Sequence, residues 1–394
     1  MTVTLKGMTW SHPRGLNSLL ASSRAYSARN PDTEVEWDAR SLQDFADYPL
    51  EDLVSQYDLL VFDHPFVGEV AASELLLPLD VALSLEFLAD QAANSVGRSH
   101  ASYQYGGHQW ALAVDAACHV SVERPDLVGA SAPQNWDDVV ADARDRASRG
   151  GPRMAIPLLA IDAFLSFVTL LVNDGNVFLA DDGSIASPDR AEAALERLAE
   201  LRSFAHPESL RWNPVQMLEA MTTTDEIAFS PITFGYVNYS TSAVQRHTVA
   251  FHAIPEGTAG RSGGVCGGAG LGVSGRSRHA DAAAQFAAYV ASRQNQTSAY
   301  VDSGGQPGHR AAWTDATIDR QHGGFFSGTL AGIDSSYLRP QWSGYLAAQT
   351  DAASRVHAWL SGDGSTAARL VAELSAVFSS ALAASPRGAA DGTH

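Results

Sequence analysis

A glycine-rich segment, Gly263–Ser274 (GGVCGGAGLGVS), is the feature that most restricts how this chain can fold. Glycine weakens a strand, so a glycine-rich strand indicates a place where side chains would block a close approach of the backbone, here expected to be its approach to a ligand. An Ala-rich helix is predicted next, over His279–Arg293, and a small-residue loop, Ser303–Arg310, follows. The G-x-G spacing in Gly267–Gly272 lacks the βαβ unit and later acidic residue of a dinucleotide fingerprint, so we expect no nucleotide site.

The N-terminal part of the chain predicts a strand–helix–strand order. Thr2–Thr9 alternates like a strand, Leu16–Ala28 reads as a helix, and Thr33–Trp37 reads as a second strand. A short buried strand, Leu59–Phe62, then stops at polar residues and a proline. Open α/β sheets bind ligands beyond the carboxyl ends of their strands. The residues that follow these strands are therefore candidate ligand contacts: Trp10, His12, Arg14, Asp63 and His64.

Three further segments complete the pattern: Tyr103–Leu127, Pro133–Val139 (PQNWDDV, a helix start with acids in its first turn) and Tyr337–Leu370. Together with the glycine-rich strand they resemble extracellular solute-binding protein family 1, the substrate-binding proteins of sugar-type ABC transporters. The resemblance extends over nearly the whole chain. Trp110, Ala113 and Val122–Glu123 depart from the family's patterns, which leaves the fold match intact and the ligand open.

The resemblance implies an α/β protein of the two-lobed, type II periplasmic-binding-protein fold. Each lobe would have a mixed sheet, and a ligand cleft would lie at the hinge between them. We expect residues 1–112 and 263–305 in the first lobe, and residues 113–262 and 306–394 in the second. Leu158–Asn173 is expected as a buried helix and Asp189–Ser203 as an amphipathic one, both structural.

The resemblance also extends the candidate ligand site to the second lobe and to the crossing segments. Ala228–Tyr239 resembles a family strand that ends at the cleft with aromatic residues downstream, although burial alone also explains such aromatics. The full expected set of ligand-binding residues is Trp10, His12, Arg14, Asp63, His64, Tyr105, His108, Trp110, Asp115, Ser230, Tyr236, Gly267, Gly268, Gln306, Arg339 and Trp342.

These residue types favour a cyclic ligand. Aromatic rings stack on the apolar faces of sugars, while Asp and His side chains form hydrogen bonds with hydroxyl groups. The set suits a neutral or weakly anionic cyclic polyol, and it equally suits an aromatic acid held by Arg14 as a forked carboxylate partner. Both ligand classes stay open at this point.

The resemblance implies a protein that closes like a hinge around a small molecule and serves as the substrate-binding component of an ABC transporter. Its expected partners are the ligand and ABC permease subunits, and we expect a monomer. The alternative is a cytoplasmic protein of this fold that acts as an enzyme or sensor on a small cyclic metabolite. His64, oriented by Asp63, would then be the catalytic acid or base. Binding without turnover is the favoured prediction.

Composition and targeting signals bear on the same question. The 394 residues suit two lobes, and the net charge of −18 argues against nucleic acid and anionic membranes. We expect no membrane insertion, metal or cofactor. The family resemblance implies an extracytoplasmic protein, but the chain starts at Met1 without a signal peptide or lipobox, which keeps a cytoplasmic location open. Cys118 and Cys266 lie in the expected crossings, where we favour two buried thiols over a disulfide.

Overall fold

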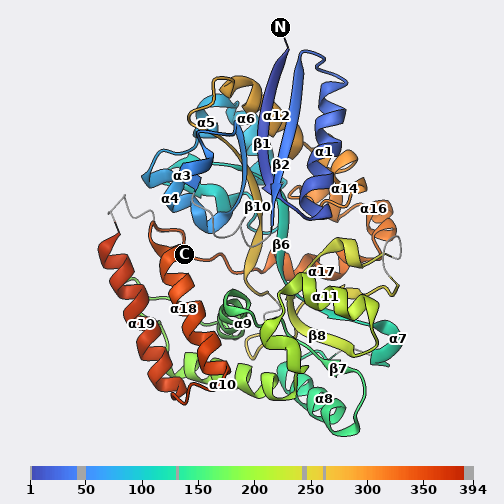
Figure 1. Ribbon diagram of the computed structural model, residues 1–394, viewed down its shortest axis with the longest axis vertical. Coiled ribbons are helices and arrows are strands. Elements are labelled where there is room, and N and C mark those ends of the chain that lie inside the picture. The colour runs from blue at the N-terminus through green and yellow to red at the C-terminus, as the bar shows by residue number, and fades with distance from the viewer. Residues whose placement is uncertain (1, 42–49, 130–132, 242–245, 261–262, 386–394) are drawn as a thin grey trace.

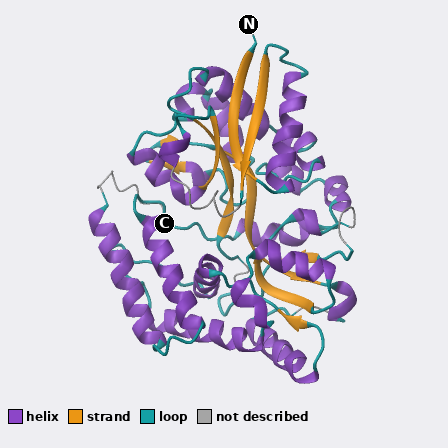
Figure 2. Cartoon of the chain, in the orientation of Figure 1, coloured by secondary structure: helices purple, strands orange, loops and turns teal. Residues whose placement is uncertain are grey.

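Eight strands form one sheet, a path of neighbours in the order β2-β1-β3-β10-β6-β8-β7 with β9 also paired to β6, while β4 and β5 pair as a separate hairpin. The structure is a computed structural model that describes residues 2–41, 50–129, 133–241, 246–260 and 263–385. The path runs through the middle of the molecule, and helices lie outside it in both halves (Figures 1 and 2). The strands are β1 Val3–Trp10, β2 Thr33–Arg40, β3 Leu59–Asp63, β4 Gln104–Tyr105, β5 His108–Gln109, β6 Leu112–Glu123, β7 Arg153–Met154, β8 Ile227–Phe234, β9 Ala250–His252 and β10 Cys266–Val273.

Two lobes are arranged along this path. In the first lobe, at the top of Figure 1, β1 pairs in parallel with β2 and β3, and β10 runs antiparallel to β3 and β6. In the second lobe, β6 runs antiparallel to β8 and β9, and β7 is parallel to β8. Each lobe therefore has a mixed sheet, as expected, and the long strand β6 belongs to both.

Helices cover the sheet in each lobe. The described helices are α1 Pro13–Ser27, α3 Leu50–Leu53, α4 Val67–Ala72, α5 Leu79–Ala82, α6 Leu85–Ala93, α7 Pro125–Val128, α8 Trp136–Arg149, α9 Ala160–Asn173, α10 Pro188–Phe204, α11 Pro214–Thr223, α12 Ala280–Ala291, α13 Arg293–Gln296, α14 Ala299–Asp302, α15 Arg310–Trp313, α16 Ala316–Gln321, α17 Phe325–Asp334, α18 Tyr345–Leu360 and α19 Ala367–Ala384. The described residues also form four short 3-10 helices: η1 His64–Phe66, η2 Ala101–Tyr103, η3 Pro207–Arg211 and η4 Val237–Tyr239.

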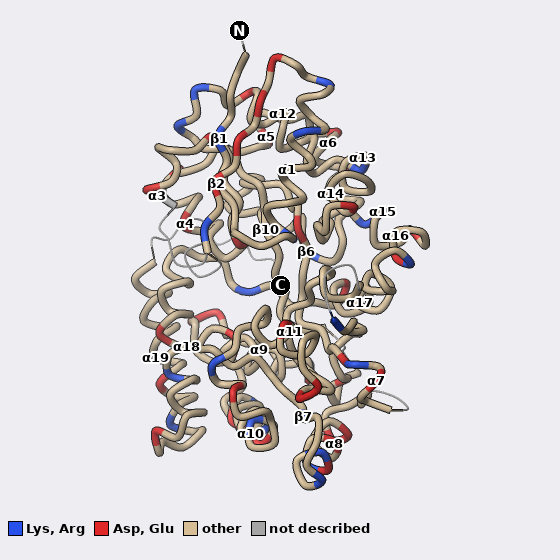
Figure 3. Tube along the Cα trace, turned by 45° about the vertical axis from the view of Figure 1, so that its right-hand side comes forward, with Lys and Arg blue, Asp and Glu red and all other residues tan. Residues whose placement is uncertain are grey.

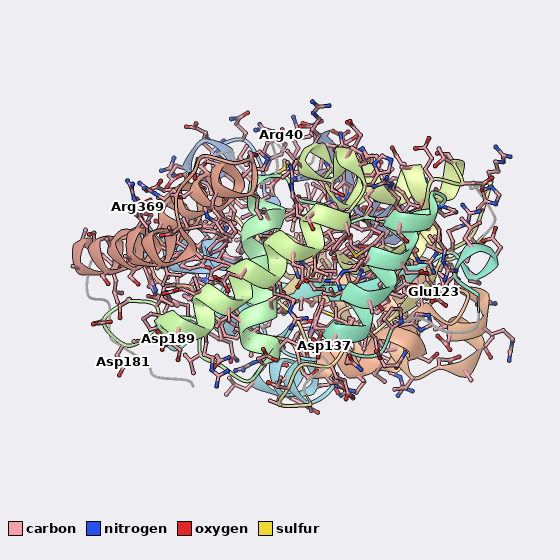
Figure 4. All side chains as sticks on the ribbon, turned by 90° about the horizontal axis from the view of Figure 1, so that it is seen from below. Arg40, Glu123, Asp137, Asp181, Asp189 and Arg369 are labelled. Carbon is pink, nitrogen blue, oxygen red and sulfur yellow. The ribbon has the colours of Figure 1, made fainter. Side chains whose placement is uncertain are left out.

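The core of each lobe follows from its helix sequences. In the second lobe α9 is apolar nearly all round and is buried among α10, α18 and α19. Asp137 and Asp189 mark the starts of α8 and α10, which pack together across the bottom of the molecule (Figure 4). In the first lobe the small residues of α12 pack on β10 and β3. The predicted helices over 158–173 and 189–203 are confirmed with small shifts of their ends.

The glycines of β10 are explained by protein atoms on either side of the strand. Gly268 has φ +107°, and a Cβ there would lie 2.4 Å from the carbonyl oxygen of Asp115 on β6. A Cβ on Gly270 would lie 2.5 Å from the ring of Tyr103. The groups that these glycines allow close to the backbone are β6 and neighbouring side chains, and the approach to a ligand expected from the sequence stays a prediction.

The two cysteines face each other on the crossing strands. Cys266 lies opposite Cys118 in the β10–β6 register, and both are buried free thiols. Burial is the first cause that raises the pKa of each thiol, to about 11 for Cys266. Both side chains therefore contribute to the core as small apolar groups.

One helix in the described part of the chain, α19, is long and apolar enough to cross a membrane by length and composition. The sequence prediction overlooked it because its charges, Arg369 and Glu373, interrupt the apolar run. Leu370, Leu374 and Phe378 pack this helix against α10 and α18, so one face of α19 belongs to the core of the second lobe.

Candidate functional site

Six of the predicted site residues gather where the lobes meet, and we call them the interlobe cluster: His12, Arg14, Asp63, Asp115, Tyr236 and Arg339. They come from five parts of the chain: the start of α1 (His12 and Arg14), the end of β3, β6, the segment after β8, and the segment before α18. His12 is the N-cap of α1, and its ring Nδ1 accepts a hydrogen bond from the Arg14 amide at 3.1 Å. Pro13 occupies the first helical position, where its missing N–H costs nothing. This local geometry fixes both His12 and Arg14 at the carboxyl end of β1.

Arg14 links three elements. Its Nε donates to Asp115 Oδ1 at 2.7 Å, and its Nη2 donates to Asp115 Oδ2. Its Nη1 donates to the carbonyl of Gly235, after β8, at 2.8 Å. Burial raises the pKa of Asp115, while the Arg14 guanidinium acts to lower it. All three nitrogens of Arg14 thus bind protein atoms, so in this conformation Arg14 is not free to take a ligand carboxylate.

Arg339 differs from Arg14 because its hydrogen-bonding capacity is only partly used. The side chain is 4% exposed, and Nη1 donates to Gln349 Oε1 at 3.1 Å. Its Nη2 lies 3.8 Å from Asp63 Oδ2, too far for a hydrogen bond, and Nε has no partner among the described residues. Buried polar groups normally have partners. Two unused donors therefore lie beside the carboxylate of Asp63, whose side chain is 40% exposed.

Aromatic side chains border the same region. The Arg14 guanidinium lies over the Tyr236 ring, 4.7 Å from its centroid, and His12 meets that ring edge-on at 5.0 Å. Burial and the charge of Arg14 lower the pKa of His12 to about 4, so the ring is neutral near pH 7. Because Nδ1 accepts from a backbone amide, the proton resides on Nε2, which can donate to a ligand.

Gln306 connects a third crossing segment to the cluster. Its Nε2 donates to the Ala116 carbonyl at 2.6 Å, and its Oε1 accepts from the Val237 amide at 3.2 Å. These bonds tie the segment at Gln306 to the backbone of β6 and to the residue that follows Tyr236. Gln306 therefore helps to position Asp115 and Tyr236, which directly precede its two partners in the chain. Its own side-chain amide is already hydrogen-bonded to the protein.

His64 lies next to the cluster but beneath the surface. It is 0% exposed, and neither ring nitrogen has a partner among the described residues. Burial and the nearby Arg339 charge hold the pKa of His64 well below its usual range. A catalytic acid or base must reach its substrate, so this conformation gives His64 no route to that role.

The other predicted site residues lie outside the cluster. Tyr105, His108 and Trp110 lie on or beside the β4–β5 hairpin, where His108 pairs with Asp80 at 2.9 Å. Ser230 is buried and donates to the Ile232 carbonyl, and Gly267 packs against Phe234. Trp10 packs against Gly15 in the first lobe, and Trp342 meets Tyr345 edge-on at the start of α18. Gly268 supports the cluster only indirectly, through its contact with the backbone of Asp115.

Two residues near the cluster were missed by the sequence analysis. Asp162 is a buried carboxylate in the first turn of α9, and Glu69 on α4 binds the start of α18. Asp162 could have been found from the sequence, because it is an acidic residue within the apolar run 158–173. No comparable signal exists for Glu69, because its partner is distant in the sequence.

A separate groove of about 590 Å³ lies between α18 and α19. Its charged residues already pair across it, since Arg355 contacts Asp351 at 2.9 Å and Glu373 at 3.4 Å. None of the predicted ligand-binding residues lines this groove. It is therefore distinct from the interlobe cluster.

Comparison with known proteins gives the same architecture. Among solved structures the chain is similar to maltose-bound MalE3 of T. maritima, with 19% identity over 95% of this chain and 98% of that one and a TM-score of 0.82. It is also similar to a solute-binding protein of Agrobacterium radiobacter K84 in complex with ribitol, with 18% identity, coverage of 96% and 98%, and a TM-score of 0.80. A third similar structure, from Agrobacterium vitis S4 with bound D-mannitol, has 15% identity, coverage of 98% and 100%, and a TM-score of 0.77.

The two-lobed fold expected from the sequence is thus confirmed. A search of curated protein sequences found no match. The model of the bacterial extracellular solute-binding protein family matches residues 11–297, well over half of the chain. The chain therefore belongs to the bacterial extracellular solute-binding protein family.

Proposed function

We propose that this protein binds a sugar or polyol at the interlobe cluster and presents it, outside the cytoplasm, to the permease of an ABC transporter. The observation that carries the proposal is the pair formed by Arg339 and Asp63. Two guanidinium nitrogens lack hydrogen bonds beside a carboxylate that is accessible. Such a pair presents donors and an acceptor side by side, as a vicinal pair of hydroxyl groups requires.

The remaining groups of the cluster suit the same ligand class. The His12 ring can donate a hydrogen bond from Nε2. The Tyr236 ring offers an apolar surface on which a sugar ring or a carbon chain can pack. A ligand carboxylate would have to bind Arg339, because Arg14 is bonded to Asp115 and Gly235. The polyol assignment is also supported by the similar proteins from the two Agrobacterium strains, whose structures contain ribitol and D-mannitol.

Hinge closure is the accompanying mechanical proposal. We assign residues 1–112 and 263–305 to one lobe and residues 113–262 and 306–394 to the other; residues 1, 262 and 386–394 at these limits lie outside the described residues. The crossings at β6, β10 and Gln306 would flex while each lobe moves as a unit. The protein would act as a monomer, since one chain supplies both sides of the site.

A ligand panel tests the proposal directly. Thermal-shift and calorimetric titrations with sugars, linear polyols and aromatic acids should give a raised melting temperature for a sugar or polyol, because a ligand of the native state stabilises it. Asp63→Asn should lose about tenfold in affinity, as expected for a hydrogen bond to a charged group.

Asp80→Asn is the matched control, because Asp80 is also a partly exposed carboxylate of the first lobe and pairs with His108 away from the cluster. It should leave ligand affinity unchanged. Binding of aromatic acids alone, or equal losses in both variants, would contradict the proposed site.

A further inference from the structure

The chain contains two cysteines, and the fold places them side by side although they are far apart in the sequence. Cys118 lies on β6 and Cys266 on β10, and the antiparallel register sets them directly opposite each other. The two strands run next to each other through the middle of the molecule in both views (Figures 1 and 3). Residues that lie directly opposite each other in a sheet project their side chains from the same face.

The backbone hydrogen bonds show which kind of antiparallel pair the cysteines form. The Cys266 amide donates to the Tyr337 carbonyl at 2.7 Å, and the Cys118 carbonyl accepts from the Gly235 amide at 3.4 Å. The backbone groups of the two cysteines therefore point away from each other. In such a non-hydrogen-bonded pair the Cα atoms are about 4.5 Å apart, and a disulfide spans Cα separations of about 4.4–6.8 Å. The pair can be bridged with the backbone where it is.

The pair also lies at the junction between the lobes. Cys118 is the last residue of β6 that pairs with β10, and His119 is the first that pairs with β8. Cys266 is the first residue of β10, and its neighbour Val265 bridges to Tyr337 in the segment before α18. A bond between the two sulfur atoms would fasten the crossing strands at the point where β6 passes from one sheet partner to the next.

We propose that Cys118 and Cys266 form a cross-strand disulfide when the chain folds in an oxidising compartment. This inference goes beyond the proposed function and shares with it only the location outside the cytoplasm, where disulfides form and persist. The oxidant is a disulfide such as oxidised glutathione. One cysteine thiolate attacks it and releases one thiolate, and the other cysteine thiolate then attacks the mixed disulfide and releases the second. The two cysteines lose two electrons and two protons, and the oxidant leaves as two thiols.

Burial determines when the bond can form. Cys118 is 2% exposed and Cys266 is 0% exposed, and burial raises the pKa of both thiols. The thiolate is the attacking species, and the folded protein both covers it and disfavours it. The bond should therefore form during folding, before β6 and β10 are covered. Once formed, it is shielded by the same burial from external thiols.

Oxidative refolding tests the proposal without any ligand, so its result is separate from that of the proposed function. The reduced protein is unfolded in urea and refolded in a buffer of reduced and oxidised glutathione. Thiol blocking and intact mass spectrometry should then show no free thiol and the loss of two hydrogen atoms. Peptide mapping should find the segments of Cys118 and Cys266 joined. The bridged protein should melt about 5 °C above the reduced one, because a bond between distant residues restricts the unfolded chain.

The matched control is the double variant Ala117→Cys/Cys118→Ala. It keeps two cysteines on β6 and β10 but moves one of them to the opposite face of the sheet. In the same buffer it should stay reduced. The single variant Cys118→Ala should lose the dependence of the melting temperature on oxidation.

Circular dichroism would show whether both variants fold. A parent protein that refolds with two free thiols overturns the inference, and so does a folded double variant that becomes bridged to the same extent as the parent. If the double variant does not fold, the parent alone decides between a bridged product, which supports the inference, and an unbridged one, which overturns it.

Discussion

The ion pair between Arg14 and Asp115 is the residue-scale contact on which the site depends. Its side chains are only 5% and 1% exposed. Removing one charge of a buried pair leaves the other without a partner and costs about 3–5 kcal/mol. Asp115→Asn should therefore lower the free energy of unfolding by about that amount in urea titrations.

The control for this variant is Asp145→Asn. Asp145 pairs with Arg149 on α8, but those side chains are 47% and 77% exposed. Exposed pairs contribute about 0–1 kcal/mol, so this variant should unfold almost as the parent does. If Asp115→Asn loses no more free energy of unfolding than the control does, Arg14 must find another partner in that variant.

Gly268 gives a second prediction at this scale. Both Gly268 (φ +107°) and Gly362 (φ +94°) have backbone angles that L-residues rarely adopt. A Cβ at Gly268 would also collide with the Asp115 carbonyl, whereas no atom lies within 4 Å of one at Gly362. Gly268→Ala should therefore lower the free energy of unfolding more than Gly362→Ala does. The loss for Gly362→Ala should be only the backbone strain, about 1–3 kcal/mol. If thermal unfolding shows the same loss of stability for both variants, the predicted collision at Gly268 is wrong.

At the scale of elements, the start of α18 is held by a residue of the other lobe. Glu69 on α4 accepts hydrogen bonds from the Gly344 amide at 2.6 Å and the Ser343 hydroxyl at 2.9 Å. A carboxylate at a helix N-terminus satisfies free amides and interacts favourably with the helix dipole. The absence of a side chain at Gly68 allows the Gln341 backbone to approach α4 closely. These contacts join α4, in the upper lobe of Figure 1, to the start of α18 in the lower lobe.

Glu69→Ala should weaken that contact. We expect a loss of about 0.5–2 kcal/mol in stability, as for other helix caps. Because the contact spans the lobes, the unliganded variant should also show a larger radius of gyration in small-angle scattering. Glu86→Ala, which changes an exposed acid in the first turn of α6, should change neither quantity. An unchanged radius for Glu69→Ala would mean that other contacts keep the lobes closed.

The elements themselves were largely predictable, and the site less so. Periodicity located β1, β3, α9 and α10 to within a few residues, because burial of one face or of a whole segment leaves its pattern in the sequence. Strand ends also pointed to His12, Arg14 and Asp63. Pairing could not be inferred, since Arg14 and Asp115 are 101 positions apart. The sequence analysis therefore treated as ligand contacts two residues that bind each other.

At the scale of the whole molecule, a buried acid links the protonation of the chain to its stability. The buried Asp162 carboxylate affects the stability of the whole chain through proton binding. Its pKa is about 8 in the folded protein and 3.8 in the unfolded chain. Between these values the folded state holds one more proton, so stability falls as pH rises.

Histidines titrate over the same window with the opposite sign. Burial lowers the pKa of His12 to about 4, that of His100 to about 4 and that of His119 to about 3, and it also lowers those of His64 and His309. In the unfolded chain these rings are about half protonated at pH 6.5, so their loss of protons up to pH 8 raises stability in the parent and in any Asp162 variant alike. One proton over this window corresponds to about 2 kcal/mol. Urea unfolding from pH 6.5 to pH 8 should therefore show a decline of about that amount in the free energy of unfolding of the parent protein relative to that of Asp162→Asn.

Asp162→Asn should remove this decline, because asparagine does not titrate, whereas Asp189→Asn, which changes an exposed acid in the first turn of a helix, should retain it. If the stability difference between the parent protein and Asp162→Asn stays constant from pH 6.5 to pH 8, Asp162 is already ionised at neutral pH.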